Sequence, residues 1–588
     1  MGMDYESVLY ELQPILQAHT VEQIPLDGDA RARYLAALDG VAVCLRSEYN
    51  RSIAGSSGLL KRLLEVLDQT LAKCFRENGV DAFWWTFASD MVRCVANCVV
   101  DNDENRHTVA EDKEVMSYVG PICELNGSEH AELQMRAVAM AKNMCLESKS
   151  YCERFAPGIK APLLGLLRRG VDDTLQLIGS GLLLDLFEVD VRASLEDLQF
   201  FAEVILAASS TVVDQGSAEQ ATSEDADLED VSLEIVGNFS QCFELVVVSE
   251  ETAVDYSDDE VPNIQSELLQ ALDELFPKQF ADKLIHMRRL MSCVGHVSAH
   301  AANSNKRERE LCYDVIRESH NGYKIGATLV VLSNSVNSST DAADVMQAVS
   351  FDQLIGAGFY LKDPMQIQGF LDIFRKLLNV SNAMELTPQA IKDLSLILKT
   401  CSDQSTFFKD ISPLLDNLLK KLLTVLPSSI LHDAITSDHC PLLETITGRD
   451  SIMSCLALDK LLICRKETPQ DKMHLLWESA LKFQDQVASG GEGHISLFYL
   501  FQLAKTFGIY LKDLDTGKQP LPDFYKAPLI QLLKFISPLQ DKNDQASQSA
   551  VNNGKFVATM IVRLVPASAE TGNSEEDKLL LQHARAFF

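Results

Sequence analysis

Apolar residues recur at helical spacing along almost the whole chain, and the stretch from 91 to 107, MVRCVANCVVDNDENRH, shows this pattern most clearly. Its apolar positions follow the three-to-four-residue period that places side chains on one face of a helix. Asn97 lies within that face. The polar run 101–105, DNDEN, then predicts the end of the helix, because short polar side chains hydrogen bond to the backbone in competing turns.

The same unit recurs downstream, with a period of about 40–47 residues when the polar residue inside each apolar face is aligned. The aligned residues are Asn97, Asn143, Asp185, Asn238, His296, Asn334 and Asn379. Beyond residue 400 the apolar pattern continues but the asparagine is lost. The period is typical of armadillo or HEAT arrays, and the unit around Asn97 resembles the third helix of an armadillo repeat. Such a unit cannot bury its apolar face alone, so neighbouring units must stack.

We therefore predict an all-α protein, a right-handed superhelical solenoid of armadillo repeats. Residues 1–58 are expected to form capping helices, residues 59–400 the clearest repeats, and residues 401–588 divergent armadillo-like repeats with a cap. Two acidic insertions, 214–230 and 250–260, contain almost no large apolar side chains. They cannot bury enough surface to offset the entropy of ordering, so we predict that both are disordered.

The recurring asparagines are candidates for partner binding, because a side-chain amide can bond a peptide backbone without regard to sequence. The alternative is that each asparagine only braces the loop of its own repeat, and the sequence favours neither. The candidate residues on the concave face are Asn97, Asn143, Asn238, Asn334 and Asn379, with Asp101 and Asp103 at the first turn.

The acidic insertions are either solvated loops without a role or an arm that recruits basic segments. The residues of this predicted arm are Glu224, Asp225, Asp227, Glu229, Asp230, Asp258, Asp259 and Glu260.

The net charge narrows the class of partner. The 588 residues include 84 Asp and Glu against 52 Lys and Arg, a net charge of −32. This charge repels nucleic acids and anionic lipids, and it attracts basic partners less strongly as salt rises. We expect no membrane span, because no long apolar run is present. We expect a monomer located in the cytoplasm, with entry into the nucleus left open.

The chain carries no recognisable catalytic motif. It has no phosphate-binding Gly-rich loop, no GxGxxG, no HExxH and no correctly spaced nucleophile elbow. Cys94 and Cys98 lie one helical turn apart, but no second Cys or His pair accompanies them with zinc-like spacing. The fourteen cysteines are therefore interpreted as small buried hydrophobes in a reducing compartment. We predict no enzyme, no metal and no cofactor.

Two segments, CVANCVVDNDENRHTVAED at 94–112 and KIGATLVVLSNSVNSSTDAADVM at 324–346, carry a family resemblance. Together with the acidic, all-helical layout, they resemble the small-GTPase GDP-dissociation stimulators. These are armadillo-repeat proteins that bind Rho- and Ras-type GTPases, and they include a yeast bud-emergence counterpart. The resemblance implies a non-catalytic protein that promotes GDP release from GTPases with polybasic, prenylated tails, or chaperones them. In such proteins an acidic surface takes the tail and an apolar pocket between repeats can take the prenyl chain.

The alternative function is an armadillo scaffold or adaptor that binds basic protein segments without nucleotide exchange. An import adaptor of this type would need Trp–Asn pairs repeated along its groove. Here Trp84 and Trp85 are adjacent and Trp477 stands alone, so the Trp ladder is missing. The hypothesis of a GTPase regulator is separated from that of a scaffold by binding and GDP release with small GTPases.

Overall fold

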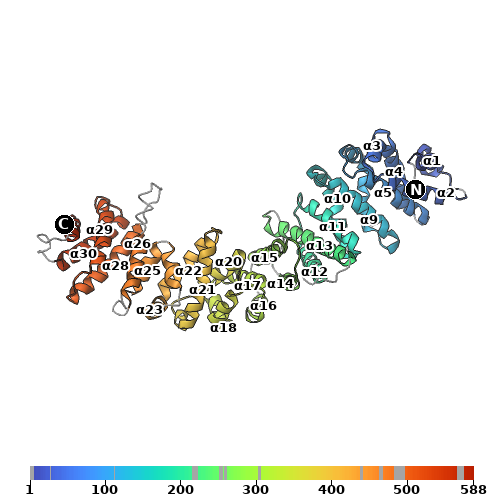
Figure 1. Ribbon diagram of the computed structural model, residues 1–588. Coiled ribbons are helices and arrows are strands. Elements are labelled where there is room, and N and C mark those ends of the chain that lie inside the picture. Colours follow the sequence, from blue (N-terminus) through green and yellow to red (C-terminus); the bar gives the residue numbers. More distant parts are fainter. Residues whose placement is uncertain are drawn as a thin grey trace. The chain divides into compact units, whose positions relative to one another are not determined.

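The structure, a computed structural model, places helices along the whole described chain and no strand within it. It describes residues 5–588 except 27, 78, 112, 213, 215–222, 251–253, 255, 257–260, 302–305, 438–440, 450, 462–467, 482–496 and 566–574. The chain divides into two compact units, Met1–Asn305 (unit 1) and Lys306–Phe588 (unit 2). In Figure 1, unit 1 runs from blue to green and unit 2 from green to red.

Unit 1 is built from α-helices with short 3₁₀ turns at η1 (Val21–Gln23) and η2 (Ser128–His130). Its described α-helices are α1 (Tyr5–Gln17), α2 (Ala30–Cys44), α3 (Glu48–Ser56), α4 (Leu59–Arg76), α5 (Ala82–Cys98), α6 (Asp103–Glu111), α7 (Lys113–Ser117), α8 (Val119–Glu124), α9 (Ala131–Cys145), α10 (Lys149–Arg168), α11 (Asp173–Phe187), α12 (Leu195–Thr211), α13 (Ser223–Val248), α14 (Val261–Leu275) and α15 (Lys283–His300).

Unit 2 has the same construction, with 3₁₀ turns at η4 (Asn382–Glu385), η6 (Asp523–Tyr525) and η7 (Ser537–Leu539). Its described α-helices are α16 (Lys306–Glu318), α17 (Gly322–Ser335), α18 (Ser339–Ala348), α19 (Phe351–Gly358), α20 (Pro364–Leu377), α21 (Pro388–Ser405), α22 (Ile411–Val425), α23 (Ser428–Thr436), α24 (Leu442–Thr447), α25 (Ser451–Leu461), α26 (Gln470–Leu481), α28 (Leu497–Thr516), α29 (Lys526–Ile536), α30 (Gln545–Leu564) and α31 (Glu575–Arg585).

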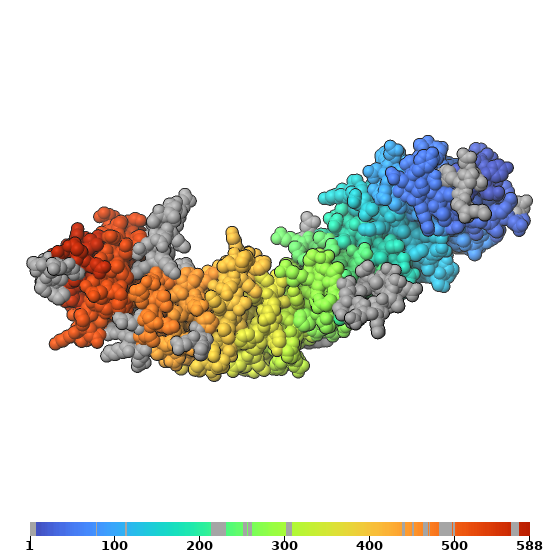
Figure 2. Space-filling view, viewed as in Figure 1, coloured from blue at the N-terminus to red at the C-terminus, as the bar shows by residue number. Residues whose placement is uncertain are grey.

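One helix of each repeat packs directly against its counterpart in the next repeat, and we call these the ladder helices. In unit 1 they are α2, α5, α9, α11, α13 and α15, and in unit 2 they are α17, α20, α22, α25, α28 and α30. The remaining helices pack behind them, and each unit presents a continuously packed surface (Figure 2). The predicted all-α, armadillo-type solenoid is confirmed.

Local sequence signals set the helix starts. The Asp172 carboxylate accepts a bond from Leu175 N at 2.8 Å and caps α11. Ser194 and Asp197 form a capping box at the start of α12, so two otherwise unpaired backbone N–H groups are satisfied. At α20, Asp363 supplies the cap and Pro364 the first helical residue, a position that needs no N–H donor.

Glycines allow a close ladder contact between α17 and α20. A β-carbon on Gly369 would lie 2.8 Å from Val330 N, and one on Gly326 would lie 2.8 Å from the Gln366 Cα atom. Neither approach is possible for a larger residue, so these two glycines let the helix backbones meet. Phe370 and Phe374 of α20 are fully buried beside this contact, and each contributes about 1.5–3 kcal/mol of hydrophobic stabilisation.

The predicted disorder of the first acidic insertion is wrong in part. Residues 223–230 form the first two turns of α13, whereas 215–222 lie outside the described residues. Alanine, leucine and glutamate are good helix formers, and negative side chains near a helix N-terminus interact favourably with the helix dipole. Composition predicted the absence of a buried core but missed this helix extension. Most of the second insertion, including Asp258, Asp259 and Glu260, lies outside the described residues.

The two-unit division differs from the boundaries predicted at 58/59 and 400/401. The boundary at 58/59 marks the end of the predicted capping helices, and that at 400/401 marks the loss of the recurring asparagine. Both remain predictions. The contact boundary falls after α15.

Candidate partner-binding surface

Three of the predicted ladder asparagines occupy equivalent positions in unit 1. Each is half-buried and donates its amide to the preceding ladder helix, so it joins two repeats instead of bracing its own loop. The bonds run from Asn97 Nδ2 to Ala42 O (2.7 Å), from Asn143 Nδ2 to Ala96 O (3.2 Å) and from Asn238 Nδ2 to Ser180 Oγ (3.1 Å). An amide has two N–H donors and one acceptor, so one such bond leaves capacity for a ligand.

Asn379 does not belong to this ladder, so that prediction is wrong. It lies beyond the end of α20, where its Oδ1 atom accepts bonds from Ser381 N (2.9 Å) and Asn382 N (3.0 Å). It therefore braces its own turn. The ladder position is taken by Lys376, whose Nζ atom donates to Ser333 O of α17 at 2.6 Å.

Sequence reasoning missed both Lys376 and a later asparagine. Asn553 of α30 donates its amide to Phe501 O of α28 at 3.3 Å, which repeats the bond of unit 1. The signal was present, because Asn553 follows an apolar period, but the alignment of asparagines had been given up beyond residue 400. Lys376 makes the same kind of bond as the asparagines, but a charged lysine does not resemble an amide in the sequence, so this equivalence could not be predicted.

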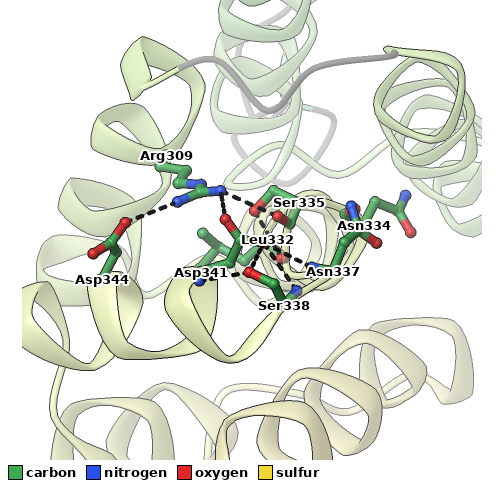
Figure 3. A network of polar contacts seen from close by, with 8 residues as sticks. All are labelled: Arg309, Leu332, Asn334, Ser335, Asn337, Ser338, Asp341 and Asp344. Carbon is green, nitrogen blue, oxygen red and sulfur yellow. Dashed lines mark hydrogen bonds and ion pairs between the residues drawn. The ribbon is translucent and has the colours of Figure 1, made fainter.

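Asn334 lies on ladder helix α17, half-buried, as predicted. Its backbone oxygen accepts a bond from Asn337 Nδ2 at 3.2 Å, at the turn that leads into α18. Figure 3 shows this turn as one polar network that runs from Arg309 on α16 to Asn334.

Arg309 is the centre of that network. Its guanidinium donates to Asp341 Oδ1 at 2.8 Å and to Ser335 O at 3.2 Å, so α16 holds the end of α17 and the start of α18 together. Asp341 also closes a capping box with Ser338. Because Arg309 and Ser338 both bond to its charged form, the pKa of Asp341 is lowered to about 2. The polar residues of the segment 324–346 therefore have a structural role, because they hold the turn between α17 and α18 in place.

The turn after α5 is a second structural brace. Asp101 is exposed and adopts a left-handed backbone conformation (φ 47°), and Asp103 begins α6 and accepts a bond from Arg106 at 3.1 Å. The buried Asn105 was missed by sequence reasoning. Its amide donates to Cys98 O at 2.8 Å and to Arg51 O at 3.0 Å. Asp101 and Asp103 therefore lie beside the Asn97 position, but Asp103 is already paired within its helix.

Ion pairs between neighbouring ladder helices neutralise many of their acidic groups. In unit 1 the pairs are Asp39–Arg93, Asp90–Arg136 (2.6 Å), Lys142–Asp185 (2.7 Å) and Glu244–Arg289 (3.3 Å), and in unit 2 they include Asp459–Lys505 (3.7 Å) and Asp515–Arg563 (3.8 Å). Burial still raises the pKa of Asp90, in spite of its bond to Arg136. Because these carboxylates are paired with basic residues, the contacts between ladder helices cannot supply the acidic surface that the net charge implies.

The negative charge is concentrated in unit 1. Residues 1–305 contain 51 acidic and 23 basic residues, a net of −28, whereas residues 306–588 contain 33 and 29, a net of −4. The stretch 193–277 holds 21 acidic residues and no Lys or Arg. It comprises α12, α13 and α14, and includes Glu224, Asp225, Asp227, Glu229 and Asp230 of the predicted arm. The strongest field for a basic partner therefore belongs to this part of unit 1.

A carboxylate pair shows the effect of this field. Gln199 of α12 donates to both Glu203 (3.0 Å) and Glu267 of α14 (2.8 Å), so one amide bridges two carboxylates. Burial and the nearby Glu203 charge raise the pKa of Glu267 to about 7. Removal from water and like charge both disfavour the ionised form.

An apolar pocket of about 530 Å³ lies beside the same helices. Its lining comes from the end of α10 and the turn after it, the start of α11, the later part of α12 and the first half of α13. The apolar lining residues include Leu167, Val171, Phe200, Val204, Ala207 and Ile235. Thr211 and Ser232 also line it, with their hydroxyl oxygens 2.9 Å apart, and the acidic insertion 214–230 lies between these two residues in the sequence. The pocket lining therefore includes residues on both sides of the insertion in the sequence.

The cysteines of the described chain are suited to packing. Burial raises the pKa of Cys98 to about 12 and that of Cys94 well above its usual range, so both stay protonated. Within the ranges that the structure describes, no group of three or more His, Cys, Asp or Glu side chains could hold a metal ion. One segment, Val231–Val248 of α13, is long and apolar enough to cross a membrane. Half of it is buried, and α13 packs between α11 and α15, so the fold itself explains its composition.

Comparison with known proteins identifies the family. Two family models match, the BEM4 N-terminal domain over residues 3–247 and the BEM4 C-terminal domain over residues 266–587. The chain belongs to the BEM4 family. A similar protein of Saccharomyces cerevisiae, the "GTPase-GDP dissociation stimulator BEM4", is 36% identical over 96% of this chain and 97% of its own length.

The family division and the contact division differ. The match to the BEM4 C-terminal domain begins at residue 266, within α14, whereas α14 and α15 both belong to unit 1. Among solved structures, the chain is similar to SYS-1, with a TM-score of 0.55 and 9% identity over 94% of this chain and 99% of the other. This likeness shows the fold alone.

Proposed function

We propose that the protein binds Rho- or Ras-type GTPases in their GDP form and promotes GDP release, as a regulator with no catalytic residues of its own. The observation that carries this proposal is the 36% identity, over nearly all of both chains, to a relative named as a GTPase-GDP dissociation stimulator. The acidic stretch 193–277 supports it, because a GTPase with a basic tail would be drawn to that surface.

The tail is proposed to bind along α12, α13 and α14. Each exposed ion pair contributes about 0.2–1 kcal/mol, so about six tail charges supply a few kcal/mol at low salt and less at high salt. A prenyl group on the tail is proposed to enter the pocket lined by Phe200 and Val204. Its volume is in the range of small-molecule sites, and each buried CH₂ contributes about 0.8 kcal/mol.

Tail binding supplies affinity but not exchange. Exchange requires a second contact that favours the nucleotide-free shape of the GTPase. The ladder around Asn334 is the proposed place for this contact, because its amide lies half-exposed on a helix that Gly326 and Arg309 hold rigidly. We place the protein in the cytoplasm as a monomer.

The test is release of a fluorescent GDP analogue from a panel of Rho- and Ras-type GTPases, each with and without its basic tail. We expect faster release for at least one GTPase, and weaker binding when the tail is deleted or the salt is raised. Binding with unchanged GDP release for every GTPase would replace this proposal with the scaffold or chaperone function. Binding that is equal at high salt and without the tail would remove the role of the acidic stretch.

The prenyl site has its own variant. Ala207 is exposed and lines the pocket, so Ala207→Trp should fill it without disturbing the core. The matched control is Ala546→Trp at an exposed position of α30. We expect Ala207→Trp to weaken binding of the prenylated GTPase alone, and equal affinity of both variants for it would place the lipid elsewhere.

A further inference from the structure

The apolar pocket of unit 1 has one basic side chain in its lining. Among the residues that the structure describes, the charged side chains of the lining are Arg168 and Asp173. The uncharged polar side chains are Gln176, Thr211 and Ser232, and the rest of the lining is apolar or glycine. The polar end of any chain bound in this pocket must therefore be recognised by these five side chains.

Arg168 is already engaged with acidic partners. Its Nη1 atom lies 3.3 Å from Glu196, and its Nη2 atom donates to Asp197. The guanidinium carbon lies 5.6 Å from the centre of the Phe200 ring, which holds the side chain against α12. The Nε atom is buried, so a ligand in the pocket does not reach it. Arg168 can therefore pair with a bound carboxylate only by giving up one of its own.

The groups around the pocket carry an excess of negative charge. Arg168 is one cation among three carboxylates, which are Asp173 in the lining and its own partners Glu196 and Asp197. The stretch 193–277, which supplies α12 and α13, contains no Lys or Arg that could offset them. This field attracts a basic tail, but it disfavours an anion at the end of that tail.

One amide is the available neutral donor of the described lining. Thr211 donates its hydroxyl hydrogen to Ala208 O at 2.8 Å, so the Ser232 hydroxyl supplies the hydrogen of the 2.9 Å contact between Ser232 and Thr211. Both hydroxyl hydrogens are thus used within the fold. Gln176 is half-buried on α11, and its side-chain amide has no partner among the residues that the structure describes. It can donate to an uncharged carbonyl oxygen.

We propose that the pocket selects a prenylated cysteine whose terminal carboxyl group is esterified over one whose carboxylate is free. This inference rests on the proposed prenyl site and adds a selection to it. A prenylated cysteine that ends a tail carries the terminal carboxyl group, which is an anion when free and neutral when esterified. A free carboxylate loses water in this lining and gains no cation, which costs free energy. The ester pays no such cost, and its carbonyl oxygen accepts a bond from Gln176.

The test is isothermal titration calorimetry of the full-length protein, near neutral pH, with N-acetyl-S-farnesylcysteine methyl ester and with the corresponding free acid. The two compounds share one chain and differ by one charge. We expect the ester to bind about tenfold more tightly. Ala207→Trp should abolish binding of both compounds, and Ala546→Trp should leave both unchanged.

The outcomes separate this inference from the proposed function. Equal affinity for the two compounds, or tighter binding of the free acid, overturns the selection and leaves the prenyl site standing. Binding of neither compound removes the prenyl site itself, and this inference with it. GDP release is not measured here, so the exchange function stands or fails separately.

Two variants test the charges directly. Gln176→Lys supplies the cation that the lining lacks, so it should raise the affinity for the free acid about tenfold. A misfolded protein cannot produce such a gain. Asp173→Asn removes the carboxylate of the lining and should narrow the preference for the ester about threefold. Its matched control, Glu188→Gln at the exposed far end of α11, should keep the full preference.

Two results with these variants contradict the proposal. One is a Gln176→Lys protein that binds the free acid no more tightly than the natural protein does. The other is an equal preference for the ester in Asp173→Asn and Glu188→Gln. Either result would show that charge in the pocket does not select the end of the bound chain.

Discussion

The two units share one helical plan but use it with different chemistry. Unit 1 joins its ladder helices through asparagine amides and carries a net charge of −28. Unit 2 uses lysines for this bond at Lys376 and Lys460 and an amide at Asn553, and it is nearly neutral. A helix stack needs only apolar faces and a donor to the preceding carbonyl, and both residues supply that donor. Either asparagine or lysine can therefore serve as this donor without loss of the stack, so the choice between them can suit the charge of a binding partner.

The largest expected effect concerns the buried brace of unit 1. Asn105→Ala removes two amide bonds and leaves Arg51 O and Cys98 O buried without their donor. An unsatisfied buried group costs about 1–3 kcal/mol, so we expect a loss of about 3 kcal/mol in the free energy of unfolding. Denaturant unfolding of the full chain should show an earlier first transition.

The matched variant in unit 2 is Asn382→Ala. Asn382 is also buried, but it bonds Leu377 O (2.8 Å) and Asn379 N (2.7 Å) within its own turn. We expect about half the loss, because no second repeat is released. Equal losses for the two variants would show that joining repeats adds nothing to the stability of unit 1.

The next effect concerns the charge difference. Glu234, Glu250 and Glu274 are exposed in the stretch without basic residues. Replacing all three by Gln should weaken binding of a basic tail peptide about fivefold at low salt, since each exposed pair contributes a few tenths of a kcal/mol. Anisotropy titrations at two salt concentrations measure this.

The control changes the same number of charges in unit 2, with Asp352→Asn, Glu385→Asn and Asp541→Asn at exposed positions. We expect little change in affinity. If both triple variants weaken binding alike, the tail responds to the total charge of the protein and the contrast between the units loses its functional meaning.

The sequence predicted the fold more completely than the site. The spacing of the apolar residues alone indicated both the α-helices and their stacking. The reason is that a helix with one apolar face forms stably only when that face is buried against a neighbour. It correctly aligned Asn97, Asn143, Asn238 and Asn334, but it could not show that three of these amides bond the preceding repeat, since that depends on a contact between residues about fifty positions apart.

The errors have definite physical causes. Asn379 was aligned by residue type, although α20 ends two residues earlier and Lys376 makes the ladder bond. Asn105 was assigned to the helix break because Asn favours turns, yet it lies inside α6 and its side chain is buried. The pocket beside α12 draws its lining from four helices, so no single stretch of sequence could reveal it.

A smaller effect tests whether Lys376 and the asparagines are equivalent. Lys376→Ala removes the donor to Ser333 O and should cost about 0.5–1 kcal/mol. Lys376→Asn should recover part of this loss, because an amide makes the same bond in unit 1. Thermal unfolding of the three proteins gives the comparison. If Lys376→Asn is as unstable as Lys376→Ala, the two ladder chemistries are not interchangeable.

The smallest effect concerns pH and the acidic surface of unit 1. The pKa of Glu267 is raised from 4.5 to about 7 in the folded protein by burial and by Glu203. Between these values the folded state holds more protons than the unfolded state, so the stability from this group is full below pH 4.5 and is lost as the pH rises through about 7.

Glu267→Gln keeps the group neutral at every pH. Relative to the natural protein, it should gain stability as the pH rises from 4.5 to about 7, the window between the unfolded and folded pKa values, and change little outside it. The effect is small because the side chain is only partly buried. Glu274→Gln, exposed on the same helix, is the matched control in unfolding series at stepped pH. A Glu267→Gln protein that follows the natural protein at every pH would mean that the hydrogen bond from Gln199 stabilises the ionised carboxylate enough to keep its pKa at the ordinary value. The acidic field of unit 1 would then act only on partners and not on the fold that holds it.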